Sequence, residues 1–253
     1  MSHEGDVVLA RERYLSGQNR NLTFLLEQRF SWMNRFIGPG MSGIEVGAGI
    51  GASRDFIDCH EFLLTDYDDL DWLDVTNVDA LDLPFDDQSL DFIVSSNMIH
   101  HVAYPVRFFD QAARVLRPGG KLLIQEIQTS VVMKAILRVM RHEGWDDNVD
   151  VFDPDLICTD PENLWSANCA IPRLLFDNPT RFESARPDFK IVFDQPSECL
   201  MFLNSGGVTA HTRSLRLSLK NLQRMAKLDS ALVGLSPNFF ALQRQVVLER
   251  LPR

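Results

Sequence analysis

The chain has 253 residues, of which 45% are hydrophobic and 24% charged, so it is long enough to bury a sizeable core. It carries 25 Lys and Arg against 35 Asp and Glu, a formal net charge of -10. Such an acidic surface repels phosphate backbones and anionic headgroups, so we expect neither nucleic acid nor a membrane surface as a partner. Apolar runs stay well short of the ~18 residues that span a membrane, and no secretory signal is visible. These features predict a cytoplasmic globular protein with a small ligand, and they leave its oligomeric state open.

The first half of the chain shows one helix and then an alternation of strands and helices. Apolar residues recur at helical spacing over residues 16–37, and residues 38–40 (Gly-Pro-Gly) end this predicted helix. A second amphipathic helix is expected from Pro105 to Leu116, ended by Gly119 and Gly120. Short apolar runs predict strands at residues 43–46, 62–65, 92–95 and 122–125. This alternation predicts an α/β fold, a doubly wound, Rossmann-like, mostly parallel sheet with helices on both faces.

The second half is less regular. Residues 132–140 form an apolar helical stripe, with Thr129 or Ser130 as its cap. Residues 143–188 show no sustained period and are interpreted as an irregular insertion with short helices. The remaining predicted elements are a strand at 189–193, a helix at 215–226 and a final strand at 240–248.

A glycine-rich turn follows the first predicted strand and opens a predicted helix, with the pattern Glu45-x-Gly47-x-Gly49-x-Gly51. Glycines let the backbone turn sharply and approach a ligand closely, and free N–H groups at a helix start favour an anionic group. The turn also satisfies the dinucleotide fingerprint, so an NAD(P)-dependent oxidoreductase and a purely structural turn are both alternatives. The Glu45 carboxylate favours neither pyrophosphate nor phosphate, because it would repel them and attract a cationic amino or sulfonium group.

Further motifs follow in order at residues 78–87, 89–97, 99–102 and 113–122. With these motifs, residues 44–126 resemble the S-adenosylmethionine-binding core of the class I methyltransferases. The likeness is greatest to the group that includes ubiquinone/menaquinone-biosynthesis and small-molecule sugar methyltransferases. The resemblance covers about a third of the chain, and it implies S-adenosyl-L-methionine as the cofactor.

The resemblance also implies where each part of the cofactor lies. Gly47, Gly49 and Gly51 would cradle the methionine end, and Glu45 would hold its amino group. The residues implied on the adenosine side are Asp66 for the ribose hydroxyls, Tyr67 for stacking on adenine, Asp79 for the adenine amino group, and the backbone of Ala80 and Leu81 for the ring nitrogens. Ser96 and Asn97 would end the fourth strand of the family, above the crevice where doubly wound folds bind ligands.

One departure from the family lies between Asp66 and Asp79. The family has a complete helix there, whereas this chain has twelve residues that must also hold the third strand. We therefore expect that helix to be lost or reduced to one turn, which leaves the adenine edge more open. As an alternative, Asp66 and Asp79 serve only as turn or helix caps.

Two histidines supply the candidates for catalysis. A hydroxyl acceptor needs a general base, and imidazole titrates in the useful range. In sugar methyltransferases that resemble this chain, the first histidine of such a pair works with an acid at the end of the fifth strand. That resemblance assigns His100, or less favourably His101, as the base and Glu126 as the acid that orients it. Alternatively, the two histidines only pack or cap the next helix.

Together these patterns predict an S-adenosylmethionine-dependent methyltransferase whose acceptor is a small molecule. The expected acceptor group is a hydroxyl of a sugar, lipid precursor or secondary metabolite. Residues 1–38 would form an N-terminal helical segment suited to a lid, 39–128 the cofactor-binding core, and 129–253 the rest of the sheet with an acceptor-binding insertion. A catalytically degenerate fold that acts as a binding partner is the non-enzymatic alternative. No metal is expected, because His3, His60 and His142 show no ligand spacing with a carboxylate or thiol.

Overall fold

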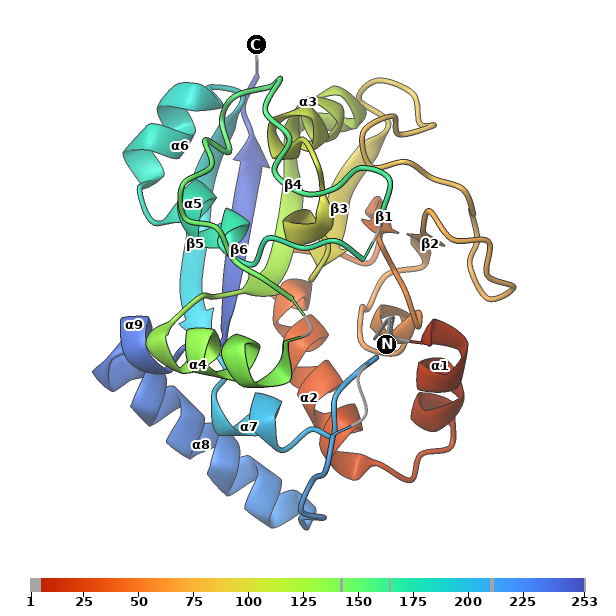
Figure 1. Ribbon diagram of the computed structural model, residues 1–253. Helices are drawn as coiled ribbons and strands as arrows, with labels where there is room; N and C mark the ends of the chain where they lie inside the picture. Colours follow the sequence, from red (N-terminus) through yellow and green to blue (C-terminus); the bar gives the residue numbers. More distant parts are fainter. Residues whose placement is uncertain (1–5, 142, 164, 210–211, 253) are drawn as a thin grey trace.

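The structure is a computed structural model that describes residues 6–141, 143–163, 165–209 and 212–252 (Figure 1). His3 and His142 lie outside these ranges. The strands are β1 (Ser42–Val46), β2 (Glu61–Thr65), β3 (Leu90–Ser96), β4 (Leu116–Ile127), β5 (Phe189–Ser197) and β6 (Gln243–Arg250). They form one sheet in the order β2-β1-β3-β4-β6-β5. β2, β1, β3 and β4 run parallel, and β6 runs antiparallel to both β4 and β5.

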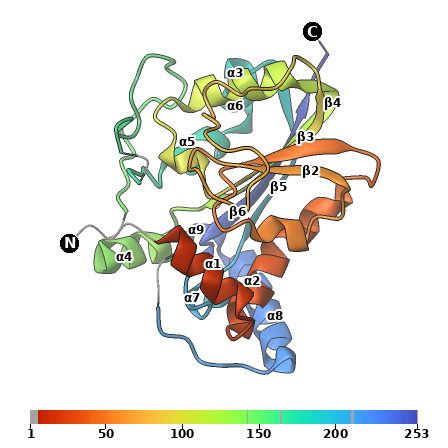
Figure 2. The same ribbon diagram turned by 90° about the vertical axis from the view of Figure 1, so that its right-hand side faces the viewer.

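Helices cover both faces of this sheet (Figure 2). Their bounds are α1 (Val7–Leu15), α2 (Arg20–Phe30), α3 (Pro105–Val115), α4 (Val131–Met140), α5 (Ile171–Phe176), α6 (Pro179–Ala185), α7 (Leu200–Leu203), α8 (Leu219–Leu235) and α9 (Pro237–Phe240). Short 3-10 helices are η1 (Ser31–Arg35), η2 (Ala52–Asp55) and η3 (Ile99–His101). The doubly wound fold predicted from the sequence is thereby confirmed.

Alternation along β3 builds the two halves of the core. Ile93 faces a cluster with α3, α5 and α6, whereas Phe92 and Val94 face a cluster with α1, α2 and η1. Successive side chains of a strand point to opposite faces, so a nearly all-apolar strand is what a doubly covered sheet requires. Within the described residues, no helix combines the length and the apolar character needed to cross a membrane.

The prediction of a helix after the glycine turn was wrong, because only the short 3-10 helix η2 forms there. Nine residues separate Gly51 from β2, and the chain must return within them to the sheet edge. A full crossover helix needs a connection of a dozen or more residues.

The expected third strand between Asp66 and Asp79 is also missing. A single bridge between Thr65 and Val75 stands in its place, and the residues between carry no helix. The loss of the family's helix in this segment was predicted correctly from its length.

Several helix boundaries differ from the prediction, and the helix expected at 215–226 is α8, which spans Leu219–Leu235. The helix expected at 16–37 begins at Arg20, capped by the Asn19 side chain, and its last turns become η1. α3 ends at Val115, because Gly119 and Gly120 belong to β4 and do not cap the helix. Ser130, one of the two expected caps of α4, accepts a hydrogen bond from the Met133 N–H.

Substituting two glycines by alanine should change the free energy of unfolding in opposite directions, which tests the packing. A Cβ at Gly43 would lie 2.6 Å from ring atoms of Phe92, which is fully buried in the neighbouring strand. Gly43→Ala should therefore lower the free energy of unfolding by ~1–3 kcal/mol through overpacking. A Cβ at Gly234 in α8 meets nothing within 4 Å, so Gly234→Ala should raise that free energy by ~0.5–1 kcal/mol. Urea unfolding measures both, and a destabilising Gly234→Ala or a neutral Gly43→Ala would contradict this description of the core.

Candidate functional site

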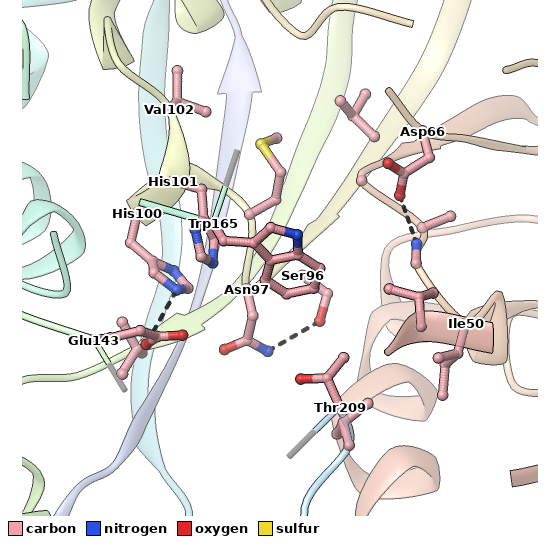
Figure 3. Close-up of a pocket in the computed structure, with 18 of the residues that line it drawn as sticks. Ile50, Asp66, Ser96, Asn97, His100, His101, Val102, Glu143, Trp165 and Thr209 are labelled. Carbon is pink, nitrogen blue, oxygen red and sulfur yellow. Dashed lines mark hydrogen bonds and ion pairs between the residues drawn. The ribbon is translucent and has the colours of Figure 1, made fainter. Parts of the chain in front are cut away.

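A cavity of about 640 Å³ lies at the carboxyl ends of β1 and β3 (Figure 3). Its volume falls within the ~300–1,000 Å³ range of small-molecule sites. The residues predicted from the sequence that line it are Glu45, Gly47, Gly49, Asp66, Tyr67, Asp79, Ala80, Leu81, Ser96, Asn97, His100 and His101. The fold thus gathers around one space the residues that the sequence had only placed in order.

The three glycines of the turn share one backbone requirement but have different surroundings. Gly47, Gly49 and Gly51 all have positive φ, at 75°, 51° and 69°. A Cβ at Gly47 would lie 2.6 Å from Met98, whereas a Cβ at Gly49 would meet nothing within 4 Å. Gly51 is outside the cavity lining, and its Cβ would contact the side chains of Arg11, Leu64 and Trp72. Gly51 therefore shapes the turn, and the other two form the cavity wall.

Glu45 is a buried acid at the base of this turn. It is 1% exposed, and its carboxylate accepts a hydrogen bond from the Ser53 hydroxyl. Burial raises the pKa of Glu45 to about 8, with the nearby Asp66 adding to the rise and Ser53 opposing it. The side chain therefore holds a proton at neutral pH until a cation replaces it. An ammonium group next to Glu45 would favour the charged carboxylate and be stabilised by it.

The acids on the adenosine side lie in the cavity wall, tied to the local backbone. Asp66 Oδ2 accepts a hydrogen bond of 2.7 Å from the Gly49 N–H (Figure 3), which links β2 to the glycine turn. Asp79 Oδ1 accepts one of 2.8 Å from the Leu81 N–H, in the geometry of an Asx turn. Tyr67 is half exposed, so this edge of the cavity is open to solvent, as its short connection predicted. The capping interpretation and the ligand-binding interpretation of these acids both agree with this arrangement.

Ser96 and Asn97 end β3 at the centre of the cavity wall. Asn97 has a φ of 51°, a conformation that non-glycine residues adopt infrequently. Its side-chain oxygen accepts a hydrogen bond of 2.9 Å from Gln243 Nε2 of β6, and its amide donates to Ser96 Oγ at 3.4 Å. The strand end is therefore fixed by the antiparallel strand from the far end of the chain.

His100 and Glu126 form a buried pair beside this strand end. Glu126 is fully buried in β4, and it accepts hydrogen bonds from the Ile99 N–H at 2.6 Å and the Ile127 N–H at 3.1 Å. His100 Nδ1 lies 2.6 Å from Glu126 Oε2, so Nδ1 carries the proton and Nε2 is left for the cavity. Burial lowers the pKa of His100, but the charges of Glu126 and Glu143 outweigh burial and raise it above 6.5.

His101 occupies a different electrostatic environment from its neighbour. Its Nδ1 lies 3.0 Å from the Ser166 carbonyl oxygen, and its ring centroid lies 4.3 Å from that of His100. Burial, together with the charge of His100, lowers the pKa of His101 to about 4. His101 is therefore neutral at physiological pH, and His100 is the more basic member of the pair. The preference for His100 as the base stays a prediction.

The sequence placed an acceptor-binding insertion within residues 129–253, but it did not identify Glu143 as part of the cavity. Glu143, from the segment after α4, lies with its Oε2 3.9 Å from His100 Nε2, and it accepts a hydrogen bond from the Cys169 thiol. The apolar lining on this side comes from α4, α7 and the insertion, with Met133, Leu137, Met140, Trp165, Phe202 and Leu203. The apolar stripe of α4 was visible in the sequence, but nothing in its pattern said that it faces a ligand space.

Comparison with known proteins shows which domains this part of the chain is similar to. Residues 44–124 match a family model described as a methyltransferase domain. A demethylmenaquinone methyltransferase of Clavibacter sepedonicus is 40% identical over 62 residues, 24% of this chain and 25% of that protein. A ubiquinone/menaquinone biosynthesis C-methyltransferase of Roseobacter denitrificans is 46% identical over 59 residues, 23% of this chain and 22% of that protein. A solved S-adenosylmethionine-dependent methyltransferase from Archaeoglobus fulgidus shares the fold, with a TM-score of 0.50 and 15% identity over 94% of this chain and 99% of that one.

The chain therefore carries a class I S-adenosylmethionine-dependent methyltransferase core, as its motifs predicted. The matched stretches span about a quarter of the length of these curated relatives. The cofactor of such a core is S-adenosyl-L-methionine, and the buried Glu45 beside open space at Gly49 fits its ammonium end. The match to a methyltransferase domain favours S-adenosyl-L-methionine over the NAD(P) of the oxidoreductase alternative.

The buried Glu45 should make stability depend on pH. Its pKa rises from 4.5 to about 8 on folding, so the folded protein keeps a proton that the unfolded chain releases. Stability from this group is fully present below pH 4.5 and is lost as the pH rises through 8, at about 1.4 kcal/mol for each unit between the two values. Glu45→Gln should remove this loss and gain stability over the wild type as the pH is raised.

Urea unfolding of the wild type and Glu45→Gln at about pH 5 and about pH 8.5 measures the effect. Glu27→Gln is the control, because Glu27 is exposed on α2. An equal difference between wild type and Glu45→Gln at both pH values would show that Glu45 does not hold the proton.

Proposed function

We propose that this protein transfers a methyl group from S-adenosyl-L-methionine to the hydroxyl of a small, largely apolar molecule. The observation that carries the proposal is the His100–Glu126 pair, which stands where the cofactor-binding wall meets the apolar wall of one cavity. A hydroxyl is a poor nucleophile near neutral pH, so a base at this junction is what such a transfer requires.

The cofactor supplies an electrophilic methyl group, and the protein has to bind it, align the acceptor and exclude water. We assign Gly47, Gly49 and Glu45 to its methionine end. The residues assigned to its adenosine end are Asp66, Tyr67, Asp79, Ala80 and Leu81, with Ser96 and Asn97 beneath. The positions of these side chains and backbone groups along one wall support the assignment.

Three segments would divide this work. Residues 1–38 would act as a lid, since Arg11 of α1 donates to the Ile50 carbonyl and Tyr14 donates to Asp55 beside the glycine turn. Residues 39–128 would bind the cofactor. Residues 129–253 complete the sheet with β5 and β6 and supply α4 and α7 for the acceptor wall.

In this mechanism His100 Nε2 would take the proton of the acceptor hydroxyl as the acceptor oxygen bonds the methyl group. The bond between that methyl group and the cofactor sulfur would break, so that S-adenosylhomocysteine leaves. Glu126 fixes the Nδ1–H tautomer and stabilises the imidazolium that results. His101, neutral and held by the Ser166 carbonyl, would position the acceptor against Trp165. The apolar side chains of α4 and α7 in the lining suit a lipid precursor or secondary metabolite, and polar residues such as Asp160 and Asn163 could bind further hydroxyl groups of the acceptor.

An activated carbon acid is the second candidate acceptor. One relative is named a C-methyltransferase and another a demethylmenaquinone methyltransferase, and removal of a proton from carbon or from an enol uses the same base. For either acceptor, the partner proposed is a small molecule and not a nucleic acid, because the chain has a net charge of -10.

Calorimetry with S-adenosylhomocysteine tests the cofactor site. We expect the wild type to bind in the micromolar range and Asp66→Ala to bind at least ~10-fold more weakly, since it loses charge-assisted hydrogen bonds to the ribose. Asp69→Ala is the matched control, because Asp69 is an exposed acid in the same loop. Undetectable binding by the wild type, or binding of NADH in its place, would end the proposal.

The role of His100 is tested by turnover with a panel of phenolic, lipid and quinol acceptors. His100→Ala should lower turnover by ~10²-fold or more while S-adenosylhomocysteine affinity is retained. The exposed His60 provides the control variant His60→Ala. Because the neutral imidazole is the base and its pKa is raised, the wild-type rate should increase with pH through a value above 6.5. Full turnover in His100→Ala would assign His100 to packing, and cofactor binding without turnover on any acceptor would favour the degenerate fold.

A further inference from the structure

Three metal-ligating side chains converge in the acceptor half of the cavity. His100 and His101 come from η3, and Glu143 comes from the segment after α4 (Figure 3). One ligand atom of each lies within 4.8 Å of the other two, and His100 Nε2 is 3.9 Å from Glu143 Oε2. No local pattern indicates this group, because 41 residues separate His101 from Glu143 along the chain.

Both imidazoles are held in the tautomer that a metal ion needs. His100 directs Nδ1 to the Glu126 carboxylate and His101 directs Nδ1 to the Ser166 carbonyl. Both acceptors take a proton from the ring, so each Nδ1 carries hydrogen and each Nε2 keeps a lone pair. Metal-bound histidines have this outer arrangement almost always, with the second ring nitrogen donating to a carboxylate or a backbone carbonyl. A general base requires this arrangement of only one histidine, whereas here both histidines have an Nδ1–H donor bond and a free Nε2.

The spacing is close to that of a bound ion. Bonds of ~2.0–2.2 Å to a tetrahedral ion keep ligand atoms ~3.3–3.6 Å apart. The present separations therefore exceed this spacing by no more than ~1.5 Å. Rotation of the partly exposed Glu143 side chain can shorten its own distances to the two imidazoles. The Cys169 thiol donates to this carboxylate at 3.2 Å and holds it toward the histidines.

We propose that His100, His101 and Glu143 form a binding site for a divalent transition-metal ion such as Zn²⁺ or Co²⁺. Two imidazoles and one carboxylate suit these ions, whereas Mg²⁺ and Ca²⁺ prefer sites made of oxygen ligands. The coordination positions that these three side chains do not fill face the cavity, where an acceptor oxygen or water completes them.

One consequence depends on the proposed function. His100 Nε2 is the atom assigned to proton removal, and a nitrogen that binds a metal ion cannot accept a proton. The ion therefore inhibits methyl transfer reversibly, and removing it with EDTA restores the rate. Metal binding itself does not depend on the activity, so the two proposals can fail separately.

Calorimetric titration of the EDTA-treated, full-length chain with ZnCl₂ tests the site. We expect one ion per chain, binding at least ~10-fold more weakly to His101→Ala and to Glu143→Gln. His60→Ala should bind as the wild type does, and MgCl₂ should give no heat of binding. An unchanged affinity for S-adenosylhomocysteine shows that each variant is folded, because none of these side chains belongs to the cofactor wall as assigned.

Co²⁺ provides a readout on the wild type that needs no variant. Bound by two imidazoles and a carboxylate, it should give visible absorption bands of tetrahedral or five-coordinate Co²⁺, and these bands should disappear when Zn²⁺ is added. Absence of Zn²⁺ binding, or binding that both His101→Ala and Glu143→Gln leave unchanged, overturns the site. Zn²⁺ binding at this site without loss of turnover overturns only the inhibition.

Discussion

A single buried carboxylate organises the reactive part of this protein. Glu126 lies in β4 without exposure to solvent, and it accepts hydrogen bonds from two backbone N–H groups and from the imidazole of His100. A buried charge is tolerated only when hydrogen bonds satisfy it, so the β4 end, η3 and His100 are fixed relative to one another. The tautomer of His100, and with it the direction of its free nitrogen, follows from this one interaction.

The opposite wall contains a second buried acid, Glu45, whose hydrogen-bond partners and pKa differ from those of a paired carboxylate. Glu45 has the neutral Ser53 hydroxyl as its hydrogen-bond partner, and burial raises its pKa to about 8. Glu45 therefore offers a binding position for a cation, and its burial lowers the free energy of unfolding at higher pH. The two acids are 81 residues apart in the chain, yet each lies on an inner strand of the same sheet. At one side of the cavity Glu45 favours a cationic group of the ligand, and at the other Glu126 supports a basic histidine.

Much of this could be predicted from local patterns. The strands, the glycine turn and the acid at the end of β4 depend on neighbouring residues, so motifs and apolar runs locate them directly. Segment lengths also carry information, because the twelve residues before Asp79 are too few for a helix and a strand. The nine residues between Gly51 and β2 are likewise too few for a crossover helix, and the helix predicted there does not form.

The acceptor side could not be predicted in this way. Glu143, Trp165 and the apolar face of α4 reach the cavity through irregular segments whose path depends on tertiary packing. The hydrogen bond between the Asn168 N–H and the His100 carbonyl, for example, joins the insertion to η3 across 68 residues. No periodicity encodes such a contact, and the grouping of Glu143 with both histidines is visible only in the folded chain.

The central claim is that Glu126 holds His100 in the Nδ1–H tautomer and raises its basicity. The most direct measurement is an NMR titration of the ¹⁵N-labelled imidazole of His100 in the wild type and in Glu126→Gln. We expect an Nδ1–H tautomer with a pKa above 6.5 in the wild type, and a lower pKa in Glu126→Gln. An Nε2–H tautomer in the wild type, or a pKa that Glu126→Gln leaves unchanged, would contradict it.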